Sequence, residues 1–276
     1  MIWFPIYVWY AGQPHWMANI VQSTKSGSDW MINEVNAYNI IVTLQNVATF
    51  FGHPILPHPS IHQVILNNEN YPIEGIQDTN DWMFFYYLDE VMVIPPGEEP
   101  AVDDFSANLL TMLQYNAPNN CYIHQWKDIP FFICGMDSHA KTNVCVIHWN
   151  LGILLLMQED KRHMESKNPE PQLIAEVIAT FQFNNLHLQS LGRQPLAQKT
   201  IPGITMVGSM PTFYKITVTQ KLIDAIQVSE YPRTATTVHK LLPPVADITE
   251  LARLGMRPLD NRAVILSCFE AFRQFL

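Results

Sequence analysis

Glu159, Asp160 and Lys161 place two carboxylates and an ammonium group one residue after an apolar run, with Gln158 between. The run from Ile153 to Met157 is short and is closed by these charges, a pattern typical of a buried strand that reaches solvent at its end. Because side chains alternate along a strand, Glu159 and Lys161 are expected on one face and Asp160 on the other. A carboxylate beside an ammonium group can hold a metal ion and a phosphate, as phosphodiester cleavage requires. The same residues could instead form a solvated ion pair that contributes little to stability.

The composition limits the classes of protein to which the chain can belong. Its 276 residues are 48% hydrophobic and 11% aromatic, which is enough for a filled core. The formal net charge of −9 argues against nonspecific coating of nucleic acid, but it is compatible with a local basic site. The four cysteines have no CxxC spacing, so we expect reduced thiols and neither disulfides nor metal ligands.

The N-terminal segment MIWFPIYVWY is very apolar but too short to span a bilayer. No Lys or Arg precedes its apolar run, so a signal peptide is the weaker interpretation. We expect residues 1–28 to form an arm that packs on the body or on a protein partner. With no other segment near transmembrane length, we expect no membrane association and an intracellular location, in the cytoplasm or the nucleus.

The elements around Glu159 are predicted from the hydrophobic periodicity of the chain. A helix over residues 101–115 carries Phe105, Leu109 and Leu113 on one stripe, and Asp103 is a candidate for its N-cap. Strands, helices and a tight turn follow along the chain. We expect strands over 121–134, 144–149, 153–161, 203–208 and 212–219, helices over 169–192 and 221–229, and a turn at 150–152.

These elements indicate an organisation in four parts. Residues 1–28 form the apolar arm, and residues 29–100 form a mainly helical lead-in packed on the core. The core spans residues 101–230. Residues 231–276 form a C-terminal tail with a final helix.

The order helix, three strands, helix, strand resembles the PD-(D/E)XK nuclease superfamily, also called restriction-endonuclease-like or RecB-like. The sequence mark of that family is an Asp early in the second strand, then Glu or Asp, any residue and Lys at the end of the third. Glu159, Asp160 and Lys161 match its second half, and Gln172 matches a Gln that many RecB-like members carry early in the next helix. The resemblance covers roughly residues 101–218. It implies an α/β fold with a central mixed sheet flanked by helices, and Mg²⁺-dependent hydrolysis of nucleic acid.

The resemblance also implies roles for individual residues. Glu159 would be a metal ligand, the carbonyl of Asp160 a further ligand, Lys161 the catalytic cation, and Gln172 would orient the water or the lysine. The family's first Asp falls at Asn143, sixteen residues before Glu159. An amide keeps an oxygen ligand but loses the negative charge, so metal affinity should fall.

Other carboxylates could restore the missing charge. Asp137 is the nearest before Asn143 in the chain, in a segment expected to be a loop. Asp103 or Asp104, on the preceding helix, could supply a further acid, as an acidic residue there does in some relatives. For Asp103, a role as a helix N-cap is the favoured interpretation.

Polar groups elsewhere complete the candidate set. Arg162, His163 and Lys167 gather near Lys161 and form a candidate phosphate-binding patch. Gln172 and Glu176 lie four residues apart, so this pair either faces the site or is solvated.

Three functions remain open from the sequence. The first is a Mg²⁺-dependent nuclease with a weakened metal site. The second is a catalytically silent nuclease fold that binds a protein or nucleic-acid partner. The third is an unrelated small-molecule enzyme whose pocket is lined by the aromatic N-terminal segments. A structural zinc at His53, His58 and His62 is disfavoured because no cysteine lies nearby.

Overall fold

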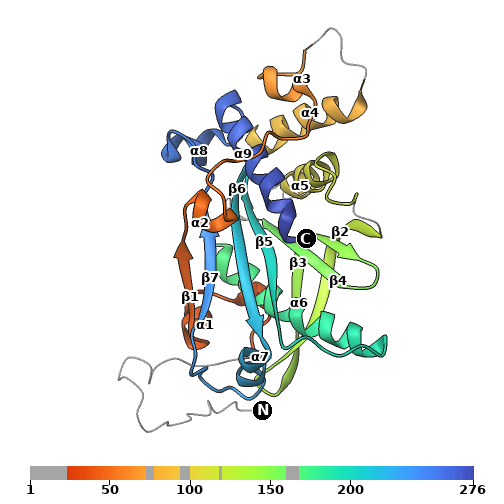
Figure 1. Cartoon of the computed structure of the whole chain (residues 1–276), viewed down its shortest axis with the longest axis vertical. Coiled ribbons are helices and arrows are strands. Elements are labelled where there is room, and N and C mark those ends of the chain that lie inside the picture. The colour runs from red at the N-terminus through yellow and green to blue at the C-terminus, as the bar shows by residue number, and fades with distance from the viewer. Residues whose placement is uncertain (1–23, 73–77, 94–99, 118–119, 160–167) are drawn as a thin grey trace.

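The computed structural model describes residues 24–72, 78–93, 100–117, 120–159 and 168–276 (Figure 1). The expected N-terminal arm therefore falls largely outside the described residues. So do five of the candidate site residues, namely Asp160, Lys161, Arg162, His163 and Lys167.

A seven-stranded mixed sheet forms the centre of the protein, in the order β1-β7-β6-β5-β4-β3-β2. Two pairs of neighbours, β1 with β7 and β4 with β5, are parallel, and the other pairs are antiparallel. The strands are β1 (Ile40–Leu44), β2 (Cys121–Ile133), β3 (Met136–His148), β4 (Gly152–Glu159), β5 (Gln198–Val207), β6 (Met210–Thr219) and β7 (Thr236–Leu241).

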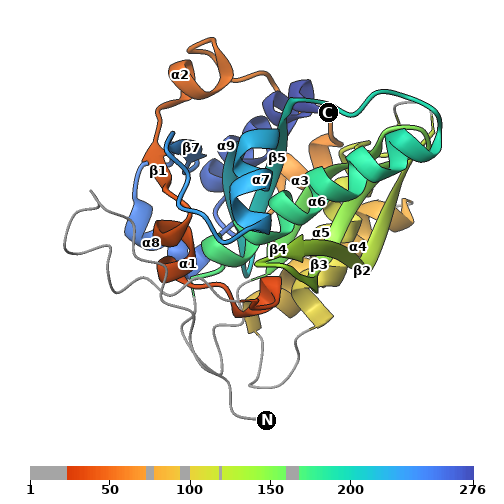
Figure 2. The same cartoon turned by 90° about the horizontal axis from the view of Figure 1, so that it is seen from below.

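Helices cover both faces of this sheet, which confirms the expected α/β class (Figures 1 and 2). One face packs against α6, with α1 and α7 beside it, and the other face packs against α4, α5 and α9. The helices are α1 (Ile32–Ala37), α2 (Val47–Phe51), α3 (Gln63–Asn67), α4 (Thr79–Val93), α5 (Pro100–Met112), α6 (Glu170–Ser190), α7 (Gln220–Gln227), α8 (Ile248–Leu254) and α9 (Leu259–Phe272).

The long helix α6 is the crossover between β4 and β5. Parallel neighbours need such a connection, because a tight hairpin can only join antiparallel strands. Pro169 precedes the first turn of α6, where a missing backbone N–H costs nothing. Leu173, Val177 and Phe181 of α6 pack into the core against the sheet. Most of the helix is buried, so α6 forms a large part of the core on this face of the sheet.

The predicted order of helix, three strands, helix and strand is confirmed over residues 100–207. The largest difference is β3, which begins at Met136, whereas the sequence predicted a strand from residue 144. Residues 136–143 pair with the second half of β2, so the expected loop is the first half of a long hairpin. The turn of that hairpin holds Cys134 and Gly135, both with positive φ.

Two strands were not expected, β1 in the lead-in and β7 in the tail. They pair with each other in parallel, from Ile40 opposite Thr236 to Leu44 opposite Lys240. The lead-in and the tail therefore extend the same sheet as the core, and the final helix α9 packs on it.

None of the helices in the described ranges is both long enough and apolar enough to cross a membrane. All four cysteines are free thiols, as expected, with Cys145 and Cys268 buried and Cys121 and Cys134 half-buried.

Candidate functional site

Asn143 of β3 lies in contact with Asp103 of α5. The Nδ2 of Asn143 donates a hydrogen bond of 3.0 Å to Oδ2 of Asp103, and both side chains are buried. The helix begins at Pro100, so Asp103 lies within its first turn and is not the N-cap that the sequence favoured. The other interpretation, that this helix supplies a further acid to the site, stays a prediction.

An irregularity in the β2–β3 pairing turns Asn143 toward α5. Ala140 and Cys145 are five residues apart, yet both pack in the cluster under α6, so the alternation of side chains is interrupted between them. Opposite this point, Trp126 of β2 has a φ of 58° and is skipped, while Gln125 pairs with Val144 and Lys127 with Thr142. The interruption leaves Asn143 facing α5.

Glu159 is the last residue of β4, which lies beside β3. Met157 pairs with Val144, and Glu159 pairs with Met206 on the other side. The backbone of Glu159 is thus two residues beyond the rung that joins β4 to Val144, a distance of about 7 Å along the strand. The structure brings Asn143 and Glu159 onto neighbouring strands, as the spacing of the motif predicts.

Asp137 lies away from this position, at the start of β3. It pairs with Phe132, and six residues of extended strand, about 20 Å, separate it from Asn143. Because residues 136–143 form strand and not a loop, Asp137 cannot swing toward Asn143 without unpairing the hairpin. It lines instead an open pocket of about 660 Å³ between β2, α6 and α7, together with Gln182, Asn185 and Gln227.

Gln172 and Glu176 lie across the sheet from Asp103. The Nε2 of Gln172 donates to Oε1 of Glu176 at 3.2 Å, and Glu176 is fully buried, so the solvated alternative is wrong for this residue. Burial raises the pKa of Glu176 well above its ordinary value, against the smaller opposing effects of hydrogen bonds from Gln172 and Thr142. Its Oε2 has no hydrogen-bond partner among the residues described. Gln172 and Glu176 therefore lie at the interface between α6 and the sheet.

A polar cluster with no local signature in the sequence joins α6 to β6 and β7. Oε2 of Glu170 accepts a hydrogen bond of 3.1 Å from the hydroxyl of Tyr214 and one of 2.8 Å from Nζ of Lys240. Burial is the main cause that raises the pKa of Tyr214, and the nearby charge of Glu170 adds to it. The three residues come from α6, β6 and β7, and only tertiary pairing brings them together.

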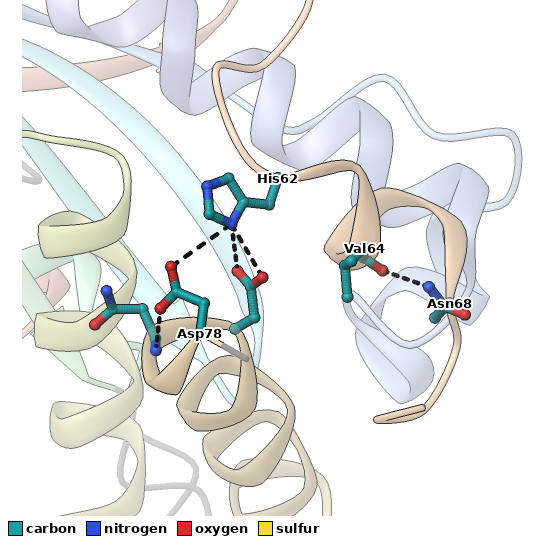
Figure 3. A network of polar contacts seen from close by, with 6 residues as sticks. His62, Val64, Asn68 and Asp78 are labelled. Carbon is teal, nitrogen blue, oxygen red and sulfur yellow. Dashed lines mark hydrogen bonds and ion pairs between the residues drawn. The ribbon is translucent and has the colours of Figure 1, made fainter. Parts of the chain in front are cut away.

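The three histidines considered for zinc do not converge, but His62 meets two carboxylates (Figure 3). Nδ1 of His53 contacts the carbonyl of Ile55 at 2.8 Å, and Nδ1 of His58 contacts the carbonyl of Pro59 at 3.1 Å. Nδ1 of His62 lies 3.0 Å from Oδ2 of Asp81 and 3.9 Å from Oδ2 of Asp78.

Among the described aromatic residues proposed to line a small-molecule pocket, those of α4 lie partly in the core and partly on the surface. Phe84 and Phe85 of α4 are buried and pack edge to face at 5.5 Å. Trp82 and Tyr86 stack on the exposed side of the same helix. The described pocket near Asp137 lies between other elements, so these aromatic residues do not line it.

The fit to Mg²⁺ is partial within the described residues. Asp103 offers one carboxylate and Asn143 one amide oxygen, both buried and in contact. Mg²⁺ is commonly bound through one or two carboxylates and keeps several waters, so these two groups form the beginning of a site. The neighbouring strand β4 ends at Glu159, a further acidic residue of the candidate set.

Comparison of the sequence with protein-family models and with curated proteins gives no match.

Proposed function

We propose that this chain is a nuclease-fold protein that hydrolyses phosphodiester bonds in nucleic acid with a weakly held Mg²⁺. The observation that carries the proposal is the contact of Asp103 with Asn143, on the strand beside the one that ends in Glu159. The order α5-β2-β3-β4-α6-β5, with β4 and β5 parallel, supports the PD-(D/E)XK resemblance.

In this proposal the missing strand carboxylate is replaced from a helix. Asp103 and Glu159 supply negative charge, and Asn143 and the carbonyl of Asp160 supply neutral oxygens. Bound Mg²⁺ would polarise the phosphate and lower the pKa of a bound water. Lys161 acts as a point charge on the phosphate or the attacking water, and Arg162, His163 and Lys167 attract the substrate backbone. Gln172 is left out, because its amide is engaged with Glu176 across the sheet.

The orientation of Asn143 explains why the metal would be held weakly. Its NH₂ group now donates to Asp103, so the amide must turn and give up this bond before its oxygen can serve as a ligand. A hydrogen bond to a charged group contributes about 2 kcal/mol. Losing it would weaken metal binding roughly 30-fold.

A second candidate is a silent nuclease fold that binds a partner, and the same hydrogen bond favours it. The carboxylate of Asp103 is already compensated by Asn143 without an ion. Such a protein could bind nucleic acid through Lys161 and its basic neighbours and cut nothing.

A cleavage assay separates the two candidates. Single- and double-stranded DNA and RNA are incubated with the protein in Mg²⁺ or Mn²⁺, and the Asp103→Asn, Glu159→Ala and Lys161→Ala variants are compared with wild type. If the protein hydrolyses nucleic acid, the cleavage rate of each variant should be at least tenfold lower than that of wild type. Asp104→Asn is the matched control, since Asp104 is exposed on the same helix turn and should keep wild-type activity. No cleavage by wild type with either ion would exclude hydrolysis of these substrates and leave the binding function.

A further inference from the structure

A second group of metal-ligating side chains lies outside the candidate site, between the segment before α3 and the start of α4. Nδ1 of His62 lies 3.1 and 3.0 Å from the two carboxylate oxygens of Asp81 and 3.9 Å from Oδ2 of Asp78. Around a tetrahedral ion with ligands at 2.0–2.1 Å, neighbouring ligand atoms are about 3.3 Å apart. The observed separations bracket this value, so small side-chain shifts would suffice to bind an ion.

Asp81 is a buried carboxylate with a single hydrogen-bonding partner among the described residues. Its side chain is only 6% exposed, and His62 is the one described residue that hydrogen-bonds its carboxylate. Both oxygens face the same nitrogen, which carries at most one proton, so one donor serves two acceptors. Buried carboxylates are ordinarily well hydrogen-bonded or bound to a metal. A cation at this point would satisfy both oxygens.

Contacts around the cluster position the chain segments that carry the three side chains. The segment after His62 is anchored by Arg262, which donates to the carbonyl of Ile65 at 2.7 Å. Asn68 donates to the carbonyl of Val64 at 2.9 Å in the same segment (Figure 3). Oδ1 of Asp78 accepts from the backbone N–H of Asn80 at 2.8 Å, while Oδ2 faces His62. Asp81 is fixed within the first turn of α4. Supporting contacts of this kind hold metal ligands in place.

The donor set selects a class of ion. One imidazole with two carboxylates suits zinc and its first-row neighbours, whereas Mg²⁺ and Ca²⁺ prefer oxygen ligands alone. His62 is 63% exposed, so water can reach the fourth position. Three protein ligands and a water is the arrangement of catalytic zinc sites, whereas structural zinc sites have four protein ligands.

We infer that His62, Asp78 and Asp81 bind a first-row divalent transition-metal ion, with Zn²⁺ as the best match. The site uses residues separate from Asp103, Asn143 and Glu159, so it does not depend on the proposed nuclease function.

Titration calorimetry with ZnCl₂ on the chelator-treated full chain tests this inference. We expect one ion per chain in wild type, and at least a tenfold loss of affinity in His62→Ala and in Asp78→Asn. His58→Ala is the matched control, because His58 lies in the same loop without a carboxylate contact and should leave binding unchanged. Asp78 is 40% exposed, so its variant is expected to fold even where a change at buried Asp81 does not.

Two outcomes would overturn the site. One is the absence of stoichiometric Zn²⁺ binding to wild type, and the other is equal binding by wild type and His62→Ala. Replacing Zn²⁺ with Co²⁺ adds a spectroscopic readout, since nitrogen and oxygen ligation gives visible absorption that His62→Ala should abolish. Asp103→Asn should bind Zn²⁺ like wild type, which keeps this test distinct from that of the nuclease proposal.

Discussion

At the residue scale, the side-chain amide of Asn143 is the group on which the metal affinity of the proposed site depends. Asn143 holds the position where the nuclease resemblance implies a carboxylate, and it donates to Asp103 at 3.0 Å. The spacing along the chain predicts that Asn143 and Glu159 lie on adjacent strands, and they do. Asp103 is a candidate acid from the resemblance, but its hydrogen bond with Asn143 could not be predicted, because it depends on the interrupted alternation opposite Trp126.

Changing Asn143 to Asp should make the thermal stability of the protein depend on divalent ions. The substitution would set two buried carboxylates about 3.0 Å apart, which is unfavourable without a cation between them. We expect Asn143→Asp to unfold several degrees below wild type in EDTA and to regain that difference in Mg²⁺. Thermal unfolding followed by circular dichroism measures both. Asn143→Ala, which adds no charge, should respond to Mg²⁺ no more than wild type does, and an equal response would argue against a charge effect.

Glu176 should make stability fall as the pH rises. Its pKa in the folded protein is raised by burial, so its contribution is complete below the unfolded value near 4.5 and is lost as the pH rises toward the folded value. Glu176→Gln should therefore be more stable than wild type at pH 8 and close to it at pH 4. Urea unfolding at the two pH values measures this difference. The exposed Asp104→Asn is the control; a pH dependence in Glu176→Gln as steep as in wild type would contradict the assignment.

At the element scale, the β3–β4 hairpin aligns the two candidate ligand strands, and Gly152 makes its turn. Gly152 has a φ of 81°, and a Cβ there would lie 2.1 Å from Oδ1 of Asn184. Asn184 bonds the backbone N–H and carbonyl of Ile153 at 2.9 and 2.7 Å. Gly152→Ala should cost about 3 kcal/mol in unfolding free energy, from backbone strain and lost hydrogen bonds.

Gly192 offers the matched control for that change. Its φ of 71° is similar, but a Cβ would meet nothing within 4 Å. Gly192→Ala should cost about 1 kcal/mol from strain alone. Equal losses in the two variants, measured by chemical denaturation, would show that the Asn184 contact has no effect.

Arg262 ties α9 to the segment around α3. Its guanidinium is fully buried and donates to the carbonyls of Met256 at 2.9 Å, Ile65 at 2.7 Å and Glu69 at 3.2 Å. Burial is the main cause that lowers its pKa to about 10, so it stays charged at neutral pH. Arg262→Ala should cost about 4 kcal/mol, because several buried carbonyls lose their donor.

The effect of Arg262→Ala should be greatest in the amide exchange of residues 62–69, which would lose protection first. Exposed Arg193→Ala should change stability by less than about 0.5 kcal/mol. Unchanged protection of residues 62–69 in Arg262→Ala would contradict the anchoring role.

The elements of the core could be predicted because their periodicity is strong. The apolar stripe of α5 and the buried run of β4 are local signals. The strand β7 could not be predicted in the same way. β7 reads TTVHKL, which is two-thirds polar, and its partners are β6 and a strand almost two hundred residues earlier. Only the tertiary pairing makes this segment a strand.

At the scale of the whole molecule, the lead-in, core and tail share one sheet and one apolar cluster. Leu241, Leu266 and Phe269 of the tail pack with Phe84 and Phe105 of the earlier segments. A chain that ends at residue 230 would lose β7 and α9 and expose this cluster. We expect the truncated chain to lack a cooperative unfolding transition, whereas the full chain unfolds in a single step. A cooperative thermal transition in the fragment would show that the tail is dispensable.

Asp103, Asn143 and Glu159 are proposed to act together in metal-dependent hydrolysis. The most direct measurement is the rate of nucleic-acid cleavage against Mg²⁺ concentration, for wild type and for Asn143→Asp. We predict measurable cleavage by wild type at high Mg²⁺, and a half-maximal concentration at least tenfold lower for Asn143→Asp, because the new carboxylate restores a charge to the ion. Absence of cleavage by both proteins at every Mg²⁺ concentration, or identical Mg²⁺ dependence in the two, would contradict the claim.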